Sequence, residues 1–142
     1  VLSLAAEKSI KAMRVPDEAV FFTGGHPYAV SRLIARNILT VTAQLARRKA
    51  RKRGFAVPDR FFGMLAGGSM KEEYLINIIR RLRPGVSEVM LHPGTADPSL
   101  SEKYGWGYNW QNELKAITSE QVRREIDDGD VRLISFRELA HD

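Results

Sequence analysis

Apolar residues in the first third of the chain recur in a pattern that predicts a helix, a strand and a second, longer helix. Residues 2–9 carry small and apolar side chains at helical spacing, and the run 10–15 resembles a strand that Pro16 ends. Turn-forming residues follow, and a long helix is expected from Tyr28 to Gly54. Its expected buried stripe recurs with the 3.6-residue period at Val30, Leu33, Ile34, Ile38, Val41 and Leu45.

The middle of the chain predicts a short strand and a buried helix. Phe61 and Phe62 begin a short apolar segment, and Ser69 with Glu72 matches the capping-box pattern that opens a helix. The expected buried side of this helix consists of Tyr74, Leu75, Ile78, Ile79 and Leu82. Arg83, Pro84 and Gly85 end it.

The last third contains the strongest predicted strand, 86–91, which runs directly into His92. A long irregular stretch follows, and loops of this length usually have a function. A helix is expected at 113–117. A second helix is expected to begin at a capping box formed by Thr118 and Gln121 and to end at Gly129. The last expected elements are a strand at 131–135 and a helix at 136–140.

The order of these elements predicts an α/β fold. Strands that alternate with helices form parallel sheets joined by right-handed crossover helices. Three or four strands are expected here, so at least one edge of the sheet would stay open unless another segment paired with it.

Composition restricts the classes of function. With 142 residues, 44% hydrophobic and 27% charged, the chain has the size and composition of one globular domain. It has no cysteine, so disulfides, thiolate zinc sites and cysteine nucleophiles are excluded, and cytoplasmic residence is expected. No apolar run reaches membrane-spanning length, and no membrane contact is expected. The first residue is Val1, which we interpret as truncation or processing.

The net charge of +5 comes largely from one run near the end of the long helix. This run consists of Arg47, Arg48, Lys49, Arg51, Lys52 and Arg53. Cations there complement the negative end of the helix dipole, which gives the run a local explanation. The alternative is a surface that binds nucleic acid or another anion, although such surfaces usually interleave aromatic residues with the cations, and this run has none.

His92 is the best candidate for chemistry. It lies at the carboxyl end of a predicted parallel strand, where active sites of α/β proteins gather, and Pro93 and Gly94 would hold it on a sharp turn. An imidazole can donate or accept a proton near neutral pH. The alternative is a histidine that caps the strand by bonding a loop carbonyl. Glu88, on the same strand face, could orient His92 or could be a buried carboxylate paired with an arginine.

Other candidates lie in loops or at strand ends. Arg14 could hold a carboxylate or an anionic intermediate at the rim, or could pair on the surface with Asp17 or Glu18. His26 precedes a proline and is expected to start a helix.

The long loop after His92 holds three candidate substrate-binding residues. Asp97 could belong to a site or could simply form a turn before Pro98. Trp106 and Trp110, with Tyr108 between them, provide flat faces that suit sugar rings, although packing over a barrel rim is an equal alternative. The sequence contains no phosphate loop, no nucleophile elbow and no HExxH motif.

The string GVSEVMLHPG, with RRLRPG before it and NELKAITSEQVRREIDDGDVRLISFREL after it, resembles the C-terminal region of YdjC-like proteins. That family includes diacetylchitooligosaccharide deacetylases and the hopanoid-associated HpnK group. The segments AMRVPDE and RFFGML are similar to other parts of the family, so the resemblance covers nearly the whole chain.

The resemblance implies that residues 1–142 are the C-terminal portion of one deacetylase domain with a distorted TIM-like (β/α) barrel. It implies a divalent metal, Mg or Zn, whose ligands lie in an N-terminal portion with Asp-Asp and His-x-His motifs that do not occur here. His92 would be the general acid, and Arg14 would steer a catalytic carboxylate. Trp110 stands where the family has an arginine, which puts a substrate contact there in doubt.

The implied reaction is removal of an acetyl group from an N-acetylated sugar or glycolipid-type substrate. This portion alone is expected to be inactive, with the N-terminal part of its own polypeptide as its partner. The alternatives are the anion-binding module, for which a nucleic-acid partner is disfavoured, and a non-catalytic structural fragment that pairs with that missing part or, as a homodimer, with another copy of itself.

Overall fold

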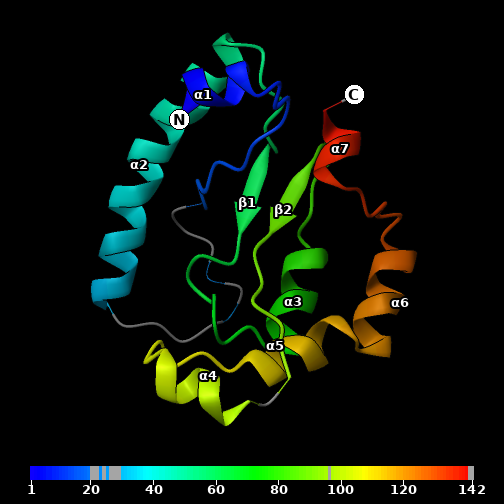
Figure 1. Cartoon of the computed structure of the whole chain (residues 1–142). Coiled ribbons are helices and arrows are strands. Elements are labelled where there is room, and N and C mark those ends of the chain that lie inside the picture. The colour runs from blue at the N-terminus through cyan, green and yellow to red at the C-terminus, as the bar shows by residue number, and fades with distance from the viewer. Residues whose placement is uncertain (20–22, 24, 26–29, 96, 141–142) are drawn as a thin grey trace.

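The computed structural model describes residues 1–19, 23, 25, 30–95 and 97–140 (Figure 1). In these residues the elements follow in the order α1 (Leu2–Glu7), α2 (Val30–Lys52), β1 (Arg60–Phe62), α3 (Glu72–Ile79), β2 (Ser87–Val89), α4 (Pro98–Lys103), α5 (Trp110–Ile117), α6 (Glu120–Asp128) and α7 (Phe136–Leu139). None of the helices in these ranges combines the length and apolarity needed to cross a membrane.

A small parallel sheet lies at the centre of the molecule. β1 and β2 pair in parallel, with Phe61 opposite Glu88. The segment before α2 lies on the other side of β1, where Ala12 and Glu18 form parallel bridges to Ala56 and Phe61. Both arrowheads in Figure 1 point toward the end where α4 and α5 lie. The expected α/β class with parallel strands is therefore confirmed.

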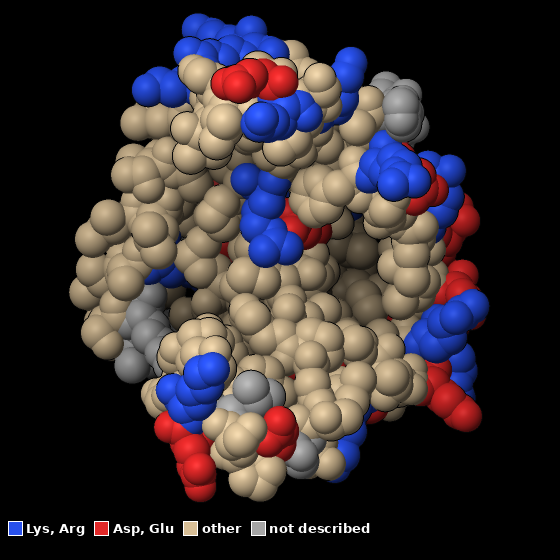
Figure 2. Space-filling view, viewed as in Figure 1, with Lys and Arg blue, Asp and Glu red and all other residues tan. Residues whose placement is uncertain are grey.

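The strands are shorter than the sequence predicts. Of the segment 86–91, only Ser87–Val89 forms strand, and the segment 10–15 contributes only an isolated bridge at Ala12. The segment 131–135 is not a strand. A cleft of about 990 Å³ lies beside β2 and is lined on its far side by this segment, and Figure 2 shows the surface hollowed to the right of centre. Strand hydrogen bonds need an adjacent partner, and 131–135 is not paired with β2, so that edge of the described sheet is open as expected.

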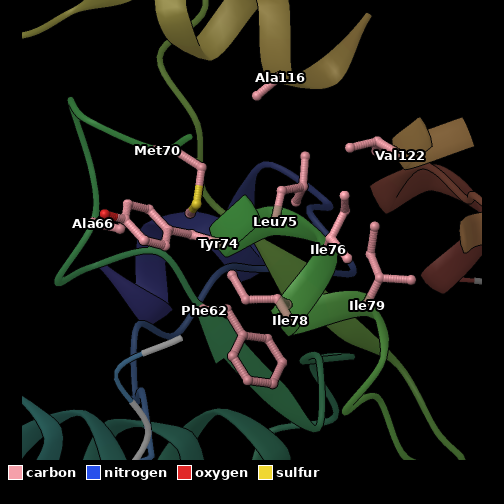
Figure 3. Packing of buried hydrophobic residues seen from close by; sticks show 10 residues of the cluster. All are labelled: Phe62, Ala66, Met70, Tyr74, Leu75, Ile76, Ile78, Ile79, Ala116 and Val122. Atoms are coloured by element: carbon pink, nitrogen blue, oxygen red, sulfur yellow. The ribbon is translucent and has the colours of Figure 1, made fainter. Parts of the chain in front are cut away.

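The main hydrophobic core forms on one face of the sheet around α3. Leu75, Ile76 and Ile79 of α3 point toward Ala116 of α5 and Val122 of α6, as Figure 3 shows. Phe62 of β1 packs beneath the same helix, next to Ile78. The apolar side predicted for this helix is confirmed for Tyr74, Leu75, Ile78 and Ile79.

The Ser69 and Glu72 capping-box prediction is wrong. α3 begins at Glu72 with Lys71 as its N-cap, and no side chain caps it. The hydroxyl of Ser69 instead donates a hydrogen bond to the carbonyl of Ala66, three residues earlier. Serine hydroxyls bond nearby backbone groups in turns as readily as at helix starts, so the pattern alone does not fix the helix boundary.

The second predicted capping box is misplaced by one residue. Ser119, not Thr118, is the N-cap of α6, and its hydroxyl accepts from the amides of Gln121 and Val122. Thr118 instead ends α5, where its hydroxyl donates to the carbonyl of Leu114. Gly129 ends α6 as predicted.

The predicted buried stripe of α2 is wrong. Val30, Ile34, Ile38, Val41 and Leu45 are between 55% and 68% exposed. The side that faces the rest of the protein instead carries Arg36, Thr40, Ala43 and Ala50, which are all buried. Arg36 and Thr40 face inward because they bind Glu18, through its carboxylate and its carbonyl respectively. Specific polar partners, which periodicity does not reveal, thus decide the orientation of this helix.

The basic run has a local structural role, as predicted, but through ion pairs. Arg47 binds the carboxylate of Asp17 and donates to the carbonyl of Asp59 at 2.7 Å. Arg51 binds the carboxylate of Asp59 at 2.9 Å. The other oxygen of Asp59 accepts from the amide of Val86 at 3.0 Å. Asp59 therefore ties the end of α2 to the starts of β1 and β2.

Asp59 should make part of the stability dependent on acid pH. The Val86 amide and, after it, Arg51 lower the pKa of Asp59 from its ordinary value of 3.8. A lowered carboxyl pKa contributes stability that is fully present above 3.8 and is lost as the pH falls through the lowered value. We expect Asp59→Asn to unfold more easily than the parent in urea at neutral pH, and this difference to shrink below pH 3.8.

The matched control is Glu102→Gln, which changes an exposed carboxylate on α4. It should leave the urea midpoint unchanged at neutral pH. A gap between parent and Asp59→Asn that stays constant down to acid pH would contradict the role of this carboxylate.

Candidate functional site

The candidate site lies at the carboxyl end of the sheet, where three loops meet. The segment at Glu18, the loop 63–70 after β1 and the turn 92–94 after β2 converge there with the start of α5. Gly63 has a φ of +103°, and a Cβ at this position would come within 2.5 Å of the Met90 carbonyl. The two strand ends can approach this closely because position 63 has no side chain.

His92 lies three residues beyond β2, at the strand end where the sequence places it. Its side chain is 31% exposed. The amide of Gly94 donates to the carbonyl of Trp110 at 3.1 Å, so the turn that carries His92 is fixed to the first residue of α5. The predicted location of this imidazole on a constrained turn is thus confirmed, while its chemical role stays a prediction.

Glu113 of α5 is a site residue that sequence reasoning missed. Its carboxylate is fully buried, accepts from the amide of Met70 at 3.0 Å and accepts from the amide of His92. One of its oxygens also lies 3.8 Å from Nδ1 of His92. Among the described residues, this buried nitrogen has no hydrogen-bond partner. The signal that could have revealed Glu113 is its position three residues before Ala116, which places a carboxylate on the buried side of α5.

The arrangement can orient an imidazole for proton transfer. A carboxylate that accepts a hydrogen bond from one ring nitrogen orients the ring and leaves the other nitrogen for a substrate. Here Nδ1 lies beside Glu113, so Nε2 is the nitrogen that could exchange a proton with a bound molecule. The same carboxylate accepts from the backbone amide of His92, which restricts the turn that carries the ring.

A row of aromatic rings leads away from His92. Ring centroids are 4.8 Å apart for His92 and Tyr108, 5.5 Å for Tyr108 and Trp106, and 4.7 Å for Trp106 and Tyr104. Trp106 is 58% exposed. The sequence prediction included Trp106, Tyr108 and Trp110 but missed Tyr104, although all four alternate in one short stretch.

Trp110 differs from Trp106 in its surroundings. Its ring centroid lies 6.2 Å from that of Tyr108, and its Cβ is so close to Gly94 that a Cβ added to the glycine would lie 3.2 Å away. It is partly buried against the turn that carries His92. Trp110 therefore supports that turn.

The side chain of Arg14 binds at a different part of the sheet from His92. It binds the carboxylate of Glu88, and its guanidinium lies 5.8 Å from the ring centroid of Phe61. Glu88 precedes His92 by four residues, which is about 13 Å along an extended strand. The alternative in which Arg14 pairs with Asp17 or Glu18 is wrong, and the alternative in which Glu88 pairs with an arginine is confirmed.

The remaining sequence candidates have local roles or lie outside the described residues. The carboxylate of Asp97 accepts from the amide and the hydroxyl of Ser99, at 2.9 and 2.7 Å, at the start of α4. This contact matches the turn alternative, and a substrate contact stays a prediction. His26 lies outside the residues that the structure describes.

Glu18 is a second buried carboxylate at this end of the sheet. It accepts from the amides of Gly63 and Leu65, at 2.6 and 3.1 Å, and lies 3.8 Å from the buried guanidinium of Arg36. Burial raises the pKa of Glu18, while the two amides and Arg36 act in the opposite direction. These contacts hold the loop after β1 against the preceding segment.

The described residues do not fit a metal site. Within 1–19, 23, 25, 30–95 and 97–140, no three histidine or carboxylate side chains gather in a way that could hold a metal ion. Both buried glutamates already bind backbone amides. The chemistry that this end of the sheet offers is proton exchange at an imidazole beside an aromatic surface.

Comparisons with known proteins give a consistent result. A family model described as YdjC-like protein matches residues 1–128. Two curated relatives are named carbohydrate deacetylase. The one from Thermoanaerobacter pseudethanolicus is 26% identical over 70% of this chain and 40% of its own length. The one from Geobacillus stearothermophilus is 29% identical over 72% of this chain and 46% of its own length.

A solved structure also resembles the fold. It is named as a cellobiose-phosphate cleavage protein from Enterococcus faecalis, with a TM-score of 0.64 at 15% identity. The likeness covers 97% of this chain and 45% of the other chain. The chain therefore spans less than half the length of the relatives that it matches.

Removal of the Glu113 charge should loosen the site. In Glu113→Gln, an amide nitrogen would replace one of the two acceptors that now bind the amides of His92 and Met70. A buried donor left without an acceptor costs about 1–3 kcal/mol. We expect this loss in the free energy of unfolding, measured by urea denaturation. Glu120→Gln, on the exposed side of α6, is the control and should change it by less than about 0.5 kcal/mol. Equal effects would show that the buried carboxylate has no special role.

Proposed function

Because the chain belongs to the YdjC-like protein family, we propose that it supplies the proton-donating histidine and a sugar-contacting surface of a carbohydrate deacetylase. The observation that carries this proposal is the position of His92. It is partly exposed at the carboxyl end of a parallel strand, beside the buried Glu113, and it begins the aromatic row.

The proposed role of His92 is that of a general acid. When a water molecule cleaves an N-acetyl group, the bond between the carbonyl carbon and nitrogen breaks, acetate forms and the nitrogen leaves as an amine. This nitrogen needs a proton as it departs, and an imidazole donates protons near neutral pH. Glu113 is a positioning residue, since it binds the His92 backbone and lies beside Nδ1.

The proposed sugar surface is the aromatic row. Sugar rings stack on flat aromatic faces, and Trp106 provides the most exposed of these faces. The substrates would be N-acetylated sugars or glycolipid-type molecules that carry them. Trp110 and Asp97 could contact the substrate at the edges of this surface, and Arg14 would act from the sheet face through Glu88.

A second portion of polypeptide would complete the enzyme. The family resemblance implies a divalent metal, Mg or Zn, and the described residues do not provide its ligands. We propose that these ligands belong to a portion outside this chain. That portion would continue the sheet into a (β/α) barrel, and the cleft beside β2 is a position where a further strand could pair.

The basic run offers less support for nucleic-acid binding. Arg47 and Arg51 are engaged with Asp17 and Asp59, so they serve the fold. Stacking aromatic side chains, which single-stranded nucleic acids require, are also missing from the run. We therefore propose a carbohydrate partner.

The first test of this proposal is catalytic. We expect the 142-residue chain, assayed with diacetylchitobiose in the presence of Mg or Zn, to release no acetate above background. The reason is that the described residues offer a proton donor but no site that activates water. Release of acetate that a chelator abolishes would contradict the proposed division of the enzyme.

The second test is sugar binding. The two tryptophans of the chain report on the aromatic row, so addition of diacetylchitobiose should change their fluorescence. We expect Trp106→Ala to weaken binding by about tenfold, because stacking on one aromatic ring contributes up to about 1.5 kcal/mol. Leu133→Ala, which alters an exposed residue elsewhere, should bind like the parent. Unchanged affinity in Trp106→Ala, measured by calorimetry, would exclude the aromatic row as the sugar surface.

A further inference from the structure

The exposed apolar stripe of α2 is unusual for a helix of a globular protein. It consists of Val30, Ile34, Ile38, Val41 and Leu45, all more than half exposed. Figure 2 shows the outer left edge of the molecule, where α2 lies in Figure 1, as mainly tan below the basic group at the top. A contiguous apolar surface of this kind marks an interaction site.

The stripe lies on the side of α2 that faces away from the sheet. Successive residues of a helix are rotated by about 100°, which places the centre of the stripe about 160° from the inward row of Arg36, Thr40, Ala43 and Ala50. A neighbouring helix in the same layer would meet α2 on its flank. The inward side is covered, since Ala43 and Ala50 belong to one buried cluster with Ala5 of α1. The stripe therefore points away from that cluster and is accessible to a partner from outside.

The spacing of the stripe matches a helix-to-helix seam. The steps in residue number are four from Ile34 to Ile38, three from Ile38 to Val41, and four from Val41 to Leu45. Alternating steps of four and three residues keep apolar side chains along one line between two packed helices. The five residues span about 24 Å, and Ile38 lies near their midpoint.

Charge determines how a second α2 could pack. The helix Val30–Lys52 contains no acidic residue, and five of its seven cations lie in its last two turns, namely Arg47, Arg48, Lys49, Arg51 and Lys52. Two parallel copies would place these basic ends side by side without a compensating charge. Two antiparallel copies would separate them by about 37 Å, well beyond the Debye length of about 8 Å at physiological salt.

We propose that α2 is the interface of a homodimer, in which two copies of this chain pack antiparallel along the stripe. Val30 of one copy lies near Leu45 of its partner, and Ile38 lies near the two-fold axis. A two-fold arrangement brings the same surface of both copies together, so one self-complementary stripe is sufficient. The proposal is independent of the deacetylase function.

The first experiment measures the mass of the full chain by sedimentation between about 1 and 100 µM. We expect a concentration-dependent dimer. Ile38→Asp should be monomeric over this range, with an unchanged circular dichroism spectrum, because Ile38 is exposed in the isolated copy. The matched control is Leu39→Asp, on the same helix and 53% exposed but outside the stripe, which should dimerise like the parent.

The second experiment determines orientation by cross-linking. The chain has no cysteine, so single introduced thiols report without interference. We expect Ile38→Cys to form disulfide-linked dimers, and a mixture of Val30→Cys and Leu45→Cys to form mixed dimers. Val30→Cys alone should not cross-link.

Three outcomes would overturn the proposal. A monomer at all concentrations would leave the stripe to another occupant, such as the remaining portion of a YdjC-like polypeptide. A dimer that Leu39→Asp disrupts and Ile38→Asp does not would place the interface elsewhere. Efficient cross-linking of Val30→Cys to itself would show a parallel arrangement.

Discussion

Two buried glutamates hold the carboxyl end of the sheet together, and the candidate site depends on them. Glu18 accepts from the amides of Gly63 and Leu65, and Glu113 accepts from those of Met70 and His92. Each carboxylate therefore bridges segments that are distant in sequence. Loop amides at strand ends lack the partners that a ladder would provide, and an unsatisfied buried amide is costly. A carboxylate with two acceptor oxygens satisfies two amides at once and fixes the loops relative to each other.

This solution explains why charged side chains are buried next to the site. Glu18 needs a compensating cation, and Arg36 of α2 provides it from inside the protein. Because Arg36 and Thr40 face inward, the apolar residues on the opposite side of α2 face solvent. The exposed stripe is thus a consequence of the same polar contacts that organise the strand ends. A single constraint at the site thereby also determines which surface is available to a partner.

The sequence predicts the helices and strands better than the contacts that these elements make with distant segments. Periodicity and strand composition located the long helix, the buried helix α3 and the strand before His92, because these signals are local. The orientation of α2 was predicted wrongly, since it depends on an ion pair with Glu18 in another segment. Glu113 was missed for the same reason, because its amide partner Met70 is 43 residues away. The strand predicted at 131–135 is not formed, because a strand requires an adjacent strand to bond and local sequence does not show whether one is present.

The open edge of the sheet and the position of His92 are related, because both lie on β2 and the segment that follows it. A proton donor at a strand end can act only where a substrate is held and a water molecule is activated, and the described residues provide an aromatic surface but no metal ligands. The open edge faces the cleft beside β2, on the same strand that leads to His92. Further strands that paired at this edge would bring their own carboxyl ends to the end of the sheet where His92 lies, because neighbouring parallel strands end on the same side. The position of His92 is therefore suited to a site that two portions of polypeptide build together.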